Sequence, residues 1–583
     1  MWIANITRGF TLVLAAACSS SATDRKVDPD RAVTAPGPTV ALRPALPVGY
    51  NADSLGSLNF EISGGTPEAR QPFFRGLLAL HSFWYEEASK QFTAAIAVDP
   101  TFSMAYWGLA MSKAKLLWGD DDITAGRAAL ARMPAPEKLP PRDQAWVMAA
   151  VSLFKADDVQ SSRRDFLAVM EQLHAYVPDD ESALFLSMAL LSTIRPGNPD
   201  ELAVRERAAG LAMEVFKRNP KHPGAAHYLI HAYDTPQLAA KALPAATLYA
   251  SIAPAAFHAL HMPAHIFARL GDWKAAATSC QAAWDASVQW AARENLSAEH
   301  HDFHSLAWLV EIGFERGRRG DADRALKVYA DAVRAGLSHG KRAAYANLVT
   351  SFLARTGEWT RAEELLAPLQ AKPLEVASAA DATACGKHAS GPAGAPTALF
   401  ERRAVLGTLA RAAAMRRDLA AALRTLDQRD AIDAELRPFL VATQPAEFVA
   451  SSDEIRKLVR KELTARARGD DRSLLGALRP LAADQDHEFT GEGMAGGLLY
   501  REEVAHTLLR LGKADQALAA YRAVLGEHAG RARAMLGAAR AAVKVGDPAT
   551  SRDHHRKLLE TWRDAEPATE GLSEARNAVE ASP

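Results

Sequence analysis

Small and apolar residues recur along this chain at the spacing of paired amphipathic helices. The first clear unit covers residues 72–100, and its marker positions are Gly76, Ala88, Phe92, Ala95 and Pro100. This spacing is typical of a tetratricopeptide repeat, a pair of antiparallel helices that recurs about every 34 residues. Small residues let the two helices approach closely, the aromatic ring fills the space between them, and proline ends the second helix.

A second part of the pattern is a glycine followed five residues later by a small residue, where the first helix ends and its partner begins. It recurs at Gly271 with Ala276, Gly320 with Ala325, Gly357 with Ala362, Gly512 with Ala517 and, more weakly, Gly546 with Ser551. Each pair alone is weak evidence, but the recurrence is specific. The chain is therefore predicted to be all-α, a tetratricopeptide-type α-solenoid that forms a right-handed superhelix of helix-turn-helix repeats.

Three interruptions divide the predicted array. Residues 133–143 (MPAPEKLPPRD) are predicted to form a proline-rich loop, and residues 487–497 (HEFTGEGMAGG) a glycine-rich loop. The low-complexity stretch 371–397 is the best domain boundary. We expect an N-terminal solenoid over residues 56–370, a linker over 371–397, C-terminal helical repeats over 398–570 and a tail over 571–583.

The first 18 residues have the layout of an export signal: a basic residue, a short apolar run and small residues before Cys18. The small residues also resemble a bacterial lipobox, in which the cysteine is lipidated and becomes the mature N-terminus. A single basic residue, Arg8, and Ala15 where leucine is usual keep open an ordinary signal peptide that ends at Ala17. We expect an exported protein of the bacterial cell envelope, membrane-anchored or periplasmic, with residues 19–55 as a disordered tether.

Composition and charge narrow the range of partners. The formal net charge of -1 gives no electrostatic reason to expect nucleic-acid or membrane-surface binding. No run of about 18 apolar residues occurs, so a lipid anchor is the membrane attachment to expect. Beyond Cys18 the chain has only Cys280 and Cys385, and no disulfide framework is predicted.

Two histidine pairs fall on the repeat register. The segment HYLIHAYD (227–234) carries His227 and His231, and HMPAHIFA (261–268) carries His261 and His265, 34 residues further on. The register puts each pair at the fifth and ninth positions of the first helix of a repeat. In proteins that this chain resembles, those positions face the concave groove of the solenoid. The same register places His258 on that surface.

Spacing and chemistry together favour a metal site on this surface. Residues four apart lie on one face of a helix, and packed helices lie about 8–10 Å apart, so two histidine pairs can offer four ring nitrogens to one ion. The candidate ligands are His227, His231, His261 and His265, with His304, Asp302 or Asp234 completing the shell. Imidazole-rich ligation suits Zn, Cu, Fe or Ni.

The histidine cluster also fits two alternatives. Nine of the 18 histidines lie between His222 and His304, which is consistent with a polar groove for an anionic or peptide ligand, or with a structural hydrogen-bond network. No HExxH motif, P-loop, dinucleotide fingerprint or Gly-x-Ser-x-Gly elbow occurs. His81 is expected at a cap or the surface, Cys280 in helix packing, and the tryptophan and tyrosine of HSFWYEEA and AYWGLAMS in the core.

Several longer motifs resemble a family of bacterial tetratricopeptide-repeat proteins. They are HSFWYEEASKQFTAAIAVDP, AYWGLAM, HPGAAHYLIHAYD, HMPAHIFARLGDW, DFHSLAWL, LLGALRP and RARAMLGAARAA, and they span most of the mature chain in the same order. The resemblance implies an α-solenoid with a histidine-lined region and carries over no established activity. The family's histidines match His222, His227, His231, His261, His265 and His304, whereas Asp234 stands where glutamate is expected.

Three functional hypotheses follow, and the sequence favours the first. It is a non-enzymatic envelope scaffold whose groove binds a protein or peptide partner. The second is a metal-dependent enzyme, a hydrolase or oxidase, and the third is a metal-handling protein that stores or delivers an ion. Both metal hypotheses predict that the ring nitrogens of His227, His231, His261 and His265 converge within about 4 to 5 Å.

Overall fold

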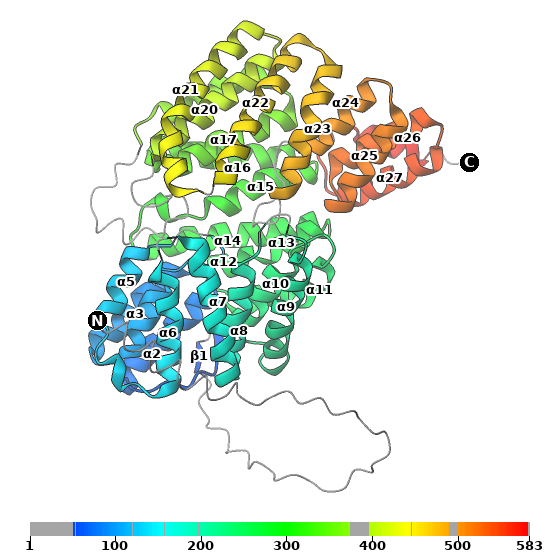
Figure 1. The fold of residues 1–583 in the computed structure, drawn as a ribbon. Coiled ribbons are helices and arrows are strands. Elements are labelled where there is room, and N and C mark those ends of the chain that lie inside the picture. Colours follow the sequence, from blue (N-terminus) through cyan, green and yellow to red (C-terminus); the bar gives the residue numbers. More distant parts are fainter. Residues whose placement is uncertain are drawn as a thin grey trace, which may run out of the picture.

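The computed structural model describes residues 50–52, 54–118, 121–156, 158–195, 198–373, 396–444, 446–488 and 499–580. Over these residues the chain is built almost wholly of helices, which follow one another as antiparallel pairs (Figure 1). Successive pairs pack on one another along the chain. The predicted all-α solenoid of helix-turn-helix repeats is confirmed.

The N-terminal part of the array ends before the low-complexity segment. Its α-helices are α2 (Pro67–His81), α3 (Tyr85–Val98), α4 (Ser103–Met111), α5 (Ile123–Ala131), α6 (Pro141–Lys155), α7 (Val159–Tyr176), α8 (Asp180–Ser192), α9 (Glu201–Arg218), α10 (Pro223–Tyr233), α11 (Ala239–Ile252), α12 (Phe257–His261), α13 (Pro263–Arg269), α14 (Trp273–Arg293), α15 (Phe303–Glu315), α16 (Arg319–Gly336), α17 (His339–Thr356) and α18 (Ala362–Leu366). Short 3-10 helices lie among them: η1 (Pro136–Lys138), η2 (Ala298–His300), η3 (Trp359–Arg361) and η4 (Ala367–Gln370).

The C-terminal part continues the same architecture. Its helices are α20 (Thr397–Met415), α21 (Leu419–Thr443), α22 (Ala446–Arg468), α23 (Asp471–Glu488), α24 (Tyr500–Arg510), α25 (Ala514–Glu527), α26 (Ala532–Val545), α27 (Pro548–Thr561) and α28 (Leu572–Glu580). Helix α20 packs on α17, so the array continues across the break between the two parts.

Glycines in the first helix of a repeat let an aromatic ring enter between neighbouring helices. A Cβ atom on Gly76 would lie 3.0 Å from the Phe92 ring, and one on Gly108 would lie 2.3 Å from it. The ring therefore fills the space between α2 and α4, as the repeat pattern predicts. Tyr521 occupies the same kind of position near Gly537 of α26, where a Cβ would lie 2.4 Å from its ring.

Left-handed glycines make the turns within several helix pairs. The φ angles of Gly271, Gly357, Gly512 and Gly546 are 78°, 72°, 75° and 78°. Glycine tolerates this conformation because it has no Cβ. After Gly271, the carboxylate of Asp272 accepts a hydrogen bond from the backbone N–H of Ala275 at 3.0 Å and caps α14.

The predicted register was wrong at one repeat. Gly320 lies inside α16 rather than in the turn before it, and the left-handed residue of that turn is Gly317, with φ of 65°. The sequence offers two overlapping glycine-to-alanine spacings here. The one that matches the turn pairs Gly317 with Ala322, which is fully buried, whereas Ala325 retains some exposure.

The folded part begins earlier than predicted. Strands β1 (Tyr50–Ala52) and β2 (Gly56–Leu58) form an antiparallel hairpin. The backbone N–H of Ser57 donates to the carbonyl of Lys221 at 3.0 Å, and Leu55 is fully buried. The disordered tether predicted over 19–55 is therefore wrong for its last residues, because these backbone and apolar contacts hold the hairpin to the solenoid.

The remaining predicted interruptions have different outcomes. Residues 133–143 hold η1 and the start of α6 as well as loop. Cys18, Cys385, most of the 371–397 linker and most of the 487–497 loop lie outside the described residues. Among the described helices, none is long and apolar enough to cross a membrane.

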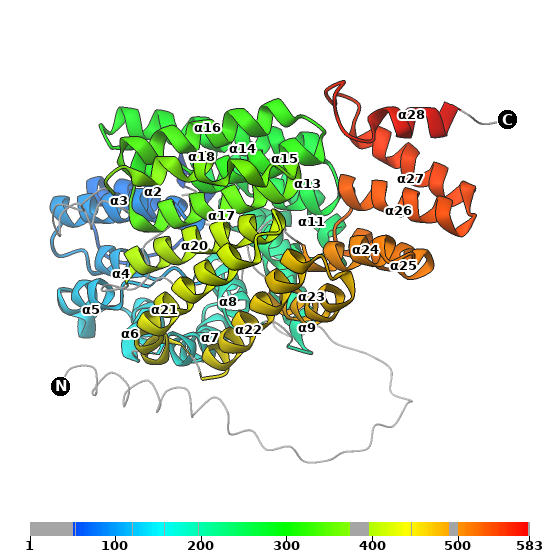
Figure 2. The same cartoon turned by 90° about the horizontal axis from the view of Figure 1, so that it is seen from above.

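The C-terminal repeats return to the middle of the array (Figures 1 and 2). Trp273 at the start of α14 donates its Nε1–H to the carbonyl of Gly530 at 2.8 Å. Trp562 donates its Nε1–H to the carbonyl of Glu315, the last residue of α15, at 3.0 Å. These contacts join segments about 250 residues apart, so the last repeats pack against the region that carries the histidines.

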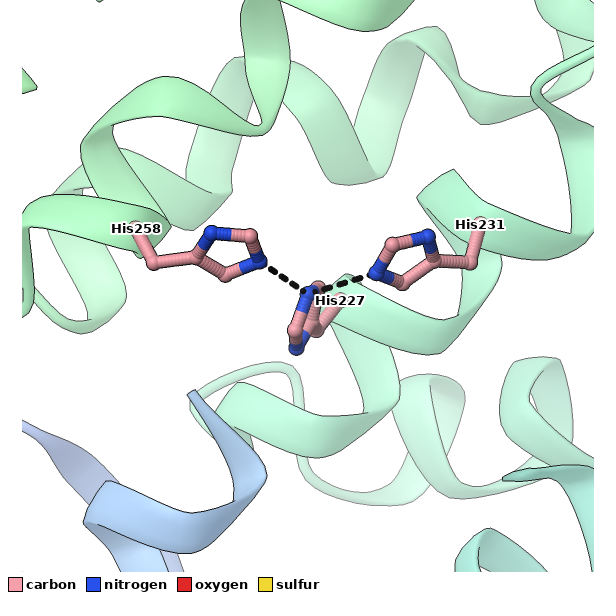
Figure 3. A group of neighbouring side chains, drawn as sticks. All are labelled: His227, His231 and His258. Carbon is pink, nitrogen blue, oxygen red and sulfur yellow. Dashed lines mark hydrogen bonds between the residues drawn. The ribbon is translucent and has the colours of Figure 1, made fainter. Parts of the chain in front are cut away.

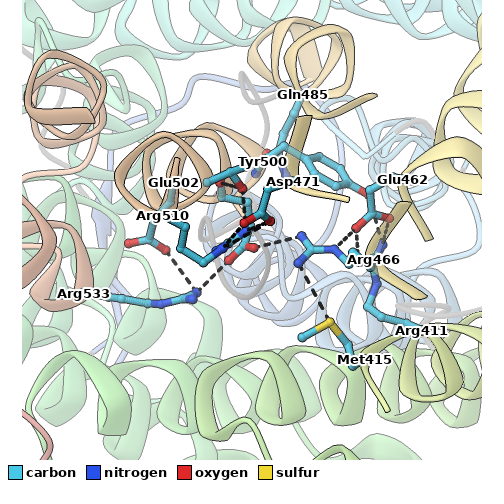
Figure 4. A network of polar contacts seen from close by, with 12 residues as sticks. Arg411, Met415, Glu462, Arg466, Asp471, Gln485, Tyr500, Glu502, Arg510 and Arg533 are labelled. Carbon is cyan, nitrogen blue, oxygen red and sulfur yellow. Dashed lines mark hydrogen bonds and ion pairs between the residues drawn. The ribbon is translucent and has the colours of Figure 1, made fainter. Parts of the chain in front are cut away.

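Buried ion pairs connect successive C-terminal helices (Figure 4). The Arg411 guanidinium of α20 donates to both carboxylate oxygens of Glu462 in α22, at 2.7 and 2.9 Å. Arg466 of α22 pairs with Glu503 of α24 at 2.8 Å, and Glu503 also pairs with Arg533 of α26 at 3.1 Å. Charges that are buried in this way need their partners, so the network fixes the relative positions of these helices.

Candidate metal centre

Three groups of possible metal ligands lie in the N-terminal part. In each group, one ligand atom from every residue lies within 4.8 Å of the others. The groups are the first triad (His227, His231 and His258), the second triad (His261, His265 and His304) and the His81 network (His81, Glu181 and His222). The two triads come from α10, α12, α13 and α15 and consist wholly of imidazoles.

His227 lies at the centre of the first triad (Figure 3). Its Nε2 atom lies 2.9 Å from Nε2 of His231 and 3.2 Å from Nε2 of His258. His227 and His231 are about one turn apart on α10, and His258 projects from α12 on the opposite side. The three residues are 0%, 6% and 9% exposed, so the triad is nearly closed to solvent.

The hydrogen bond at the second ring nitrogen of His227 determines which nitrogen of the ring carries the lone pair. Nδ1 of His227 donates a hydrogen bond to the backbone carbonyl of His81 at 2.7 Å. The neutral ring then carries its lone pair on Nε2, the atom that faces the other two histidines. Burial lowers the pKa of His227 to about 3 and the pKa of His231 well below its usual value. Both rings are therefore neutral, and able to bind a metal ion, at pH 7.

Aromatic rings surround the first triad. The ring centroid of Phe83, in the turn between α2 and α3, lies 4.4 Å from that of His227 and 5.4–5.5 Å from those of the other two imidazoles. The ring of Tyr249 stacks on His227 at 5.2 Å. Phe83 has a φ of 52°, which is unfavourable for a bulky residue. Packing against the triad therefore outweighs backbone strain at this turn.

The second triad joins three helices. Nε2 of His261 in α12 lies 3.1 Å from Nε2 of His265 in α13, and the ring centroid of His304 in α15 lies 4.7 Å from that of His261. Pro263 begins α13, so the single helix expected here is split between the two histidines. His261 and His265 are buried, whereas His304 is exposed to solvent.

Both buried rings of the second triad present a lone pair on Nε2. Nδ1 of His265 donates to the carboxylate of Asp234 at 2.9 Å. Nδ1 of His261 lies 2.9 Å from the Ser305 hydroxyl, which itself donates to the Asp302 carboxylate. Because its proton goes to Asp302, the Ser305 oxygen accepts from Nδ1 of His261. The Nε2 atoms of the two rings lie 3.1 Å apart, and both are acceptors when each ring carries its proton on Nδ1.

In that state a cation between the two Nε2 atoms, a proton or a metal ion, stabilises the pair. A proton on His261 is disfavoured at neutral pH, because burial and the neighbouring His304 and His265 lower the pKa of His261 well below its usual value. Although burial alone would raise the pKa of Asp234, Arg269 at 2.8 Å and His265 lower it well below its usual value. Asp234 is therefore ionised and holds His265 in the tautomer that a metal requires.

The nitrogen separations fit transition-metal coordination. With bonds of about 2.0–2.1 Å, two nitrogen ligands lie about 2.9 Å apart at a right angle and about 3.3 Å apart at a tetrahedral angle. The measured separations are 2.9 and 3.2 Å in the first triad and 3.1 Å in the second. Each triad thus supplies imidazole nitrogens at metal-binding spacing and leaves at least one coordination position for another ligand.

The His81 network is centred on Glu181, and of its histidine nitrogens only the buried Nδ1 of His222 has no hydrogen-bond partner. Glu181 accepts from Nε2 of His81 at 2.7 Å and from Nε2 of His222 at 3.0 Å. The Tyr228 hydroxyl lies 2.9 Å from Nδ1 of His81 and donates to it. Burial alone would raise the pKa of Glu181, but His81 and His222 lower it to about 2. Because Glu181 already engages both imidazoles, the network is better suited to positioning than to metal binding.

A glycine lets the His81 network reach the first triad. A Cβ on Gly224 would lie 2.5 Å from Nδ1 of His81, so only glycine allows the start of α10 to approach this ring. The carbonyl of the same His81 accepts the Nδ1 hydrogen bond of His227. The network therefore fixes the orientation of a triad member from outside the triad.

The structure corrects the predicted ligand set. Among the described residues, the four predicted histidines do not converge on one point: His227 and His231 join His258, and His261 and His265 join His304. Asp234 and Asp302 support ligands through hydrogen bonds instead of completing a shell. The predicted open groove is also wrong for the four histidines, which are buried by neighbouring helices and aromatic rings.

Several residues of the centre were not predicted. His81, expected at a cap or the surface, is fully buried, and Phe83 and Glu181 were overlooked because each is an isolated residue far from the histidine motifs. The repeat register correctly placed His258 on the same side of the helices as His227 and His231. The aromatic residues of the first repeats are core, as predicted, and Cys280 is buried with its Sγ 3.7 Å from Nδ1 of His261.

Comparisons with known proteins add little to this centre. No protein-family model matches the chain, and neither does any curated protein sequence. Among solved structures, the chain is similar to a monomeric mutant of IFIT1 with Gppp-AAAA, with 10% identity, 84% of this chain and 90% of that chain covered, and a TM-score of 0.30. It is also similar to yeast Tom70, with 11% identity, 75% and 96% covered, and a TM-score of 0.28. None of these likenesses is close enough to carry an argument about function.

Proposed function

We propose that this protein binds transition-metal ions at the two histidine triads. The observation that carries the proposal is the 3.1 Å separation of the Nε2 atoms of His261 and His265, with a separate hydrogen-bond partner at the other nitrogen of each ring. A buried pair of acceptors is unfavourable unless a cation lies between them. The depressed pKa of His261 makes a metal ion the better candidate for that cation.

The ligand chemistry favours Cu or Zn. Neutral imidazoles suit Zn, Cu, Fe and Ni, and affinity for divalent ions in nitrogen sites is greatest for Cu. Structural Zn sites usually have four protein ligands, whereas sites that bind a water or substrate keep one position open. The triads supply three histidines each, which favours an ion that exchanges a ligand, as in a metal-dependent hydrolase or oxidase or a metal-delivery protein.

Elemental analysis of the folded, untagged protein tests the proposal. The wild-type chain is expected to bind about one ion per triad, and His227→Ala and His265→Ala are each expected to lose the ion of their own triad. His300→Ala is the matched control, because His300 lies in the same histidine-rich region but in neither triad. A metal-free wild type that gains no metal on titration with Zn²⁺ or Cu²⁺, together with variants as stable as wild type, would falsify the proposal.

A partner-binding role is a second candidate, supported by one observation. A pocket of about 840 Å³ lies where α15–α17 meet the C-terminal repeats, and Arg319, Arg355, Arg533 and Arg540 are among its lining residues. We propose that it binds a protein or peptide. A photo-crosslinking residue in place of the exposed Lys544 is expected to capture one defined partner, and Arg540→Glu to abolish that product. Crosslinks that Arg540→Glu leaves unchanged contradict this role.

Export and lipidation remain proposals based on the N-terminal sequence. Residues 1–18 match an export signal that ends at a lipidated cysteine. Cys18→Ser is expected to abolish incorporation of labelled fatty acid and to release the protein from membranes. Retention of the label in Cys18→Ser contradicts lipidation, and an unprocessed cytoplasmic protein contradicts export.

A further inference from the structure

We propose that the two triads form a single dinuclear metal centre. The inference rests on the metal binding proposed above and extends it from two separate sites to one reactive unit. Two observations support it. Helices α10 and α12 connect the two triads, and the second triad is open to solvent beside His304.

One short helix supplies a ligand to each triad. Helix α12 has five residues, and His258 and His261 lie three residues apart on it. Their ring centroids are 6.2 Å apart, and the ring planes make an angle of 35°. Residues at this spacing share a helix face, so the two rings project from α12 in similar directions. A movement of α12 therefore displaces a ligand in both triads together.

A second connection runs through the end of α10. His231 belongs to the first triad, and Asp234 follows it by three residues at the C-terminus of the same helix. Asp234 accepts the hydrogen bond that orients His265 in the second triad. One helix thus carries two ligands of one ion and the carboxylate that positions a ligand of the other.

The rings on α12 limit the distance between the ions. A metal ion lies about 3 Å from the centroid of an imidazole that binds it, because a bond of about 2.0–2.1 Å adds to the radius of the ring. With the centroids of His258 and His261 6.2 Å apart, the two ions lie at most about 12 Å from each other. Two Cu²⁺ ions within this distance interact magnetically, which makes the arrangement measurable.

The exposed side of the second triad gives a small ligand access to the centre. The first triad is nearly closed, and its residues are at most 9% exposed. His304, in contrast, is exposed, whereas its partners His261 and His265 are buried. A ligand that enters beside His304 reaches the ion of the second triad first.

Copper loading of the full chain tests the dinuclear centre. We expect two Cu²⁺ per chain and an electron paramagnetic resonance spectrum that is broadened by the dipolar interaction of the two coupled ions. His304→Ala, which changes an exposed side chain, and His258→Ala are each expected to leave one copper with an uncoupled spectrum. His300→Ala, outside both triads, is expected to keep the coupled spectrum.

The outcomes separate this inference from the binding proposal. Two coppers whose spectrum equals the sum of the two single-site variants overturn the dinuclear centre but leave metal binding intact. One copper per chain in the wild type also overturns the dinuclear centre, and a folded wild type that binds no copper and no zinc overturns both proposals. Circular dichroism melting of each variant establishes that lost coupling does not come from unfolding.

Discussion

The Nε2 atoms of His261 and His265 face each other at 3.1 Å, and the other nitrogen of each ring has its own hydrogen-bond partner. This arrangement suits two ligands of one ion. The supporting acceptors are Asp234 and, through Ser305, Asp302. Both lie next to the histidines in space and favour a proton on Nδ1 of each ring.

Asp234→Asn is expected to weaken metal binding at the second triad by about 10–100-fold, as loss of a partner of a ligating histidine usually does. Without a carboxylate, Nδ1 of His265 loses its ionised acceptor, and the tautomer with a lone pair on Nε2 is less favoured. Isothermal titration with Zn²⁺ measures the two affinities separately, and the first triad is expected to keep its own.

Asp272→Asn is the matched control for that substitution. Asp272 caps α14 through Ala275 and contacts neither triad, and asparagine caps helices as well as aspartate does. Equal Zn²⁺ affinities for Asp234→Asn and wild type contradict the assigned role of Asp234.

The repeat pattern predicted the fold and the helices of the centre, but not which histidines meet. Aligning equivalent positions 34 residues apart paired His227 with His261. The contacts that form are 31 residues apart, between His227 and His258 and between Asp234 and His265. Equivalent residues of adjacent helices are thus displaced by nearly one turn, and the break at Pro263 adds to the shift. A repeat register identifies positions, whereas contact also depends on how neighbouring helices slide along each other.

Some parts of the centre leave no local signal in the sequence. His81 and Phe83 come from the first repeat. His81 lies 146 residues before His227 in the sequence. The left-handed backbone of Phe83 is set by packing against the triad and not by its own sequence. The role of such residues depends on contacts between distant repeats. A local sequence pattern does not contain these contacts, so it assigns the residues only to the core or to the surface.

Gly224→Ala is expected to destabilise the protein by about 1–3 kcal/mol, the usual cost of overpacking a well-packed interior. The new Cβ would lie 2.5 Å from Nδ1 of His81, whose ring is held by Glu181 and Tyr228 and cannot easily move. Displacing His81 also moves the carbonyl that orients His227, so Zn²⁺ affinity at the first triad is expected to fall. Urea unfolding and Zn²⁺ titration measure the two effects.

Gly210→Ala supplies the control in a neighbouring helix. A Cβ on Gly210, within α9, would meet no atom within 4 Å, so the substitution is expected to stabilise the protein by about 0.5–1 kcal/mol through helix propensity. If Gly224→Ala is stabilising to the same extent, the close approach of α10 to His81 has no energetic consequence.

The metal-free protein is expected to lose stability as the pH falls below about 6.5. Burial lowers the pKa of folded His227 from the usual 6.5 to about 3, so between these values the unfolded chain takes up a proton that the folded chain does not. Stability therefore rises with pH in this window, by about 1.4 kcal/mol per pH unit for each such histidine. Urea unfolding in the presence of a chelator at a series of pH values measures the slope.

Removing one of these histidines tests the origin of the slope. His227→Gln has no ring to protonate, and its slope between about pH 5 and pH 6.5 is expected to be shallower than that of wild type. An identical slope in His227→Gln and wild type means that other groups cause the acid sensitivity.

Glu315 holds the middle repeats to the C-terminal repeats, and Glu315→Ala is expected to destabilise the protein by about 3–5 kcal/mol. Its carboxylate pairs with Arg355 at 2.8 Å and with Arg531 at 3.5 Å, and accepts from the backbone N–H of Ala532 at 2.7 Å. The substitution leaves buried guanidinium groups without part of the negative charge that compensates them.

Asp331→Ala, which breaks the exposed pair with Lys327, is expected to cost less than about 1 kcal/mol. Urea unfolding ranks the two variants, and limited proteolysis is expected to release the C-terminal repeats in Glu315→Ala only. Equal losses of stability in the two variants contradict a connecting role for Glu315.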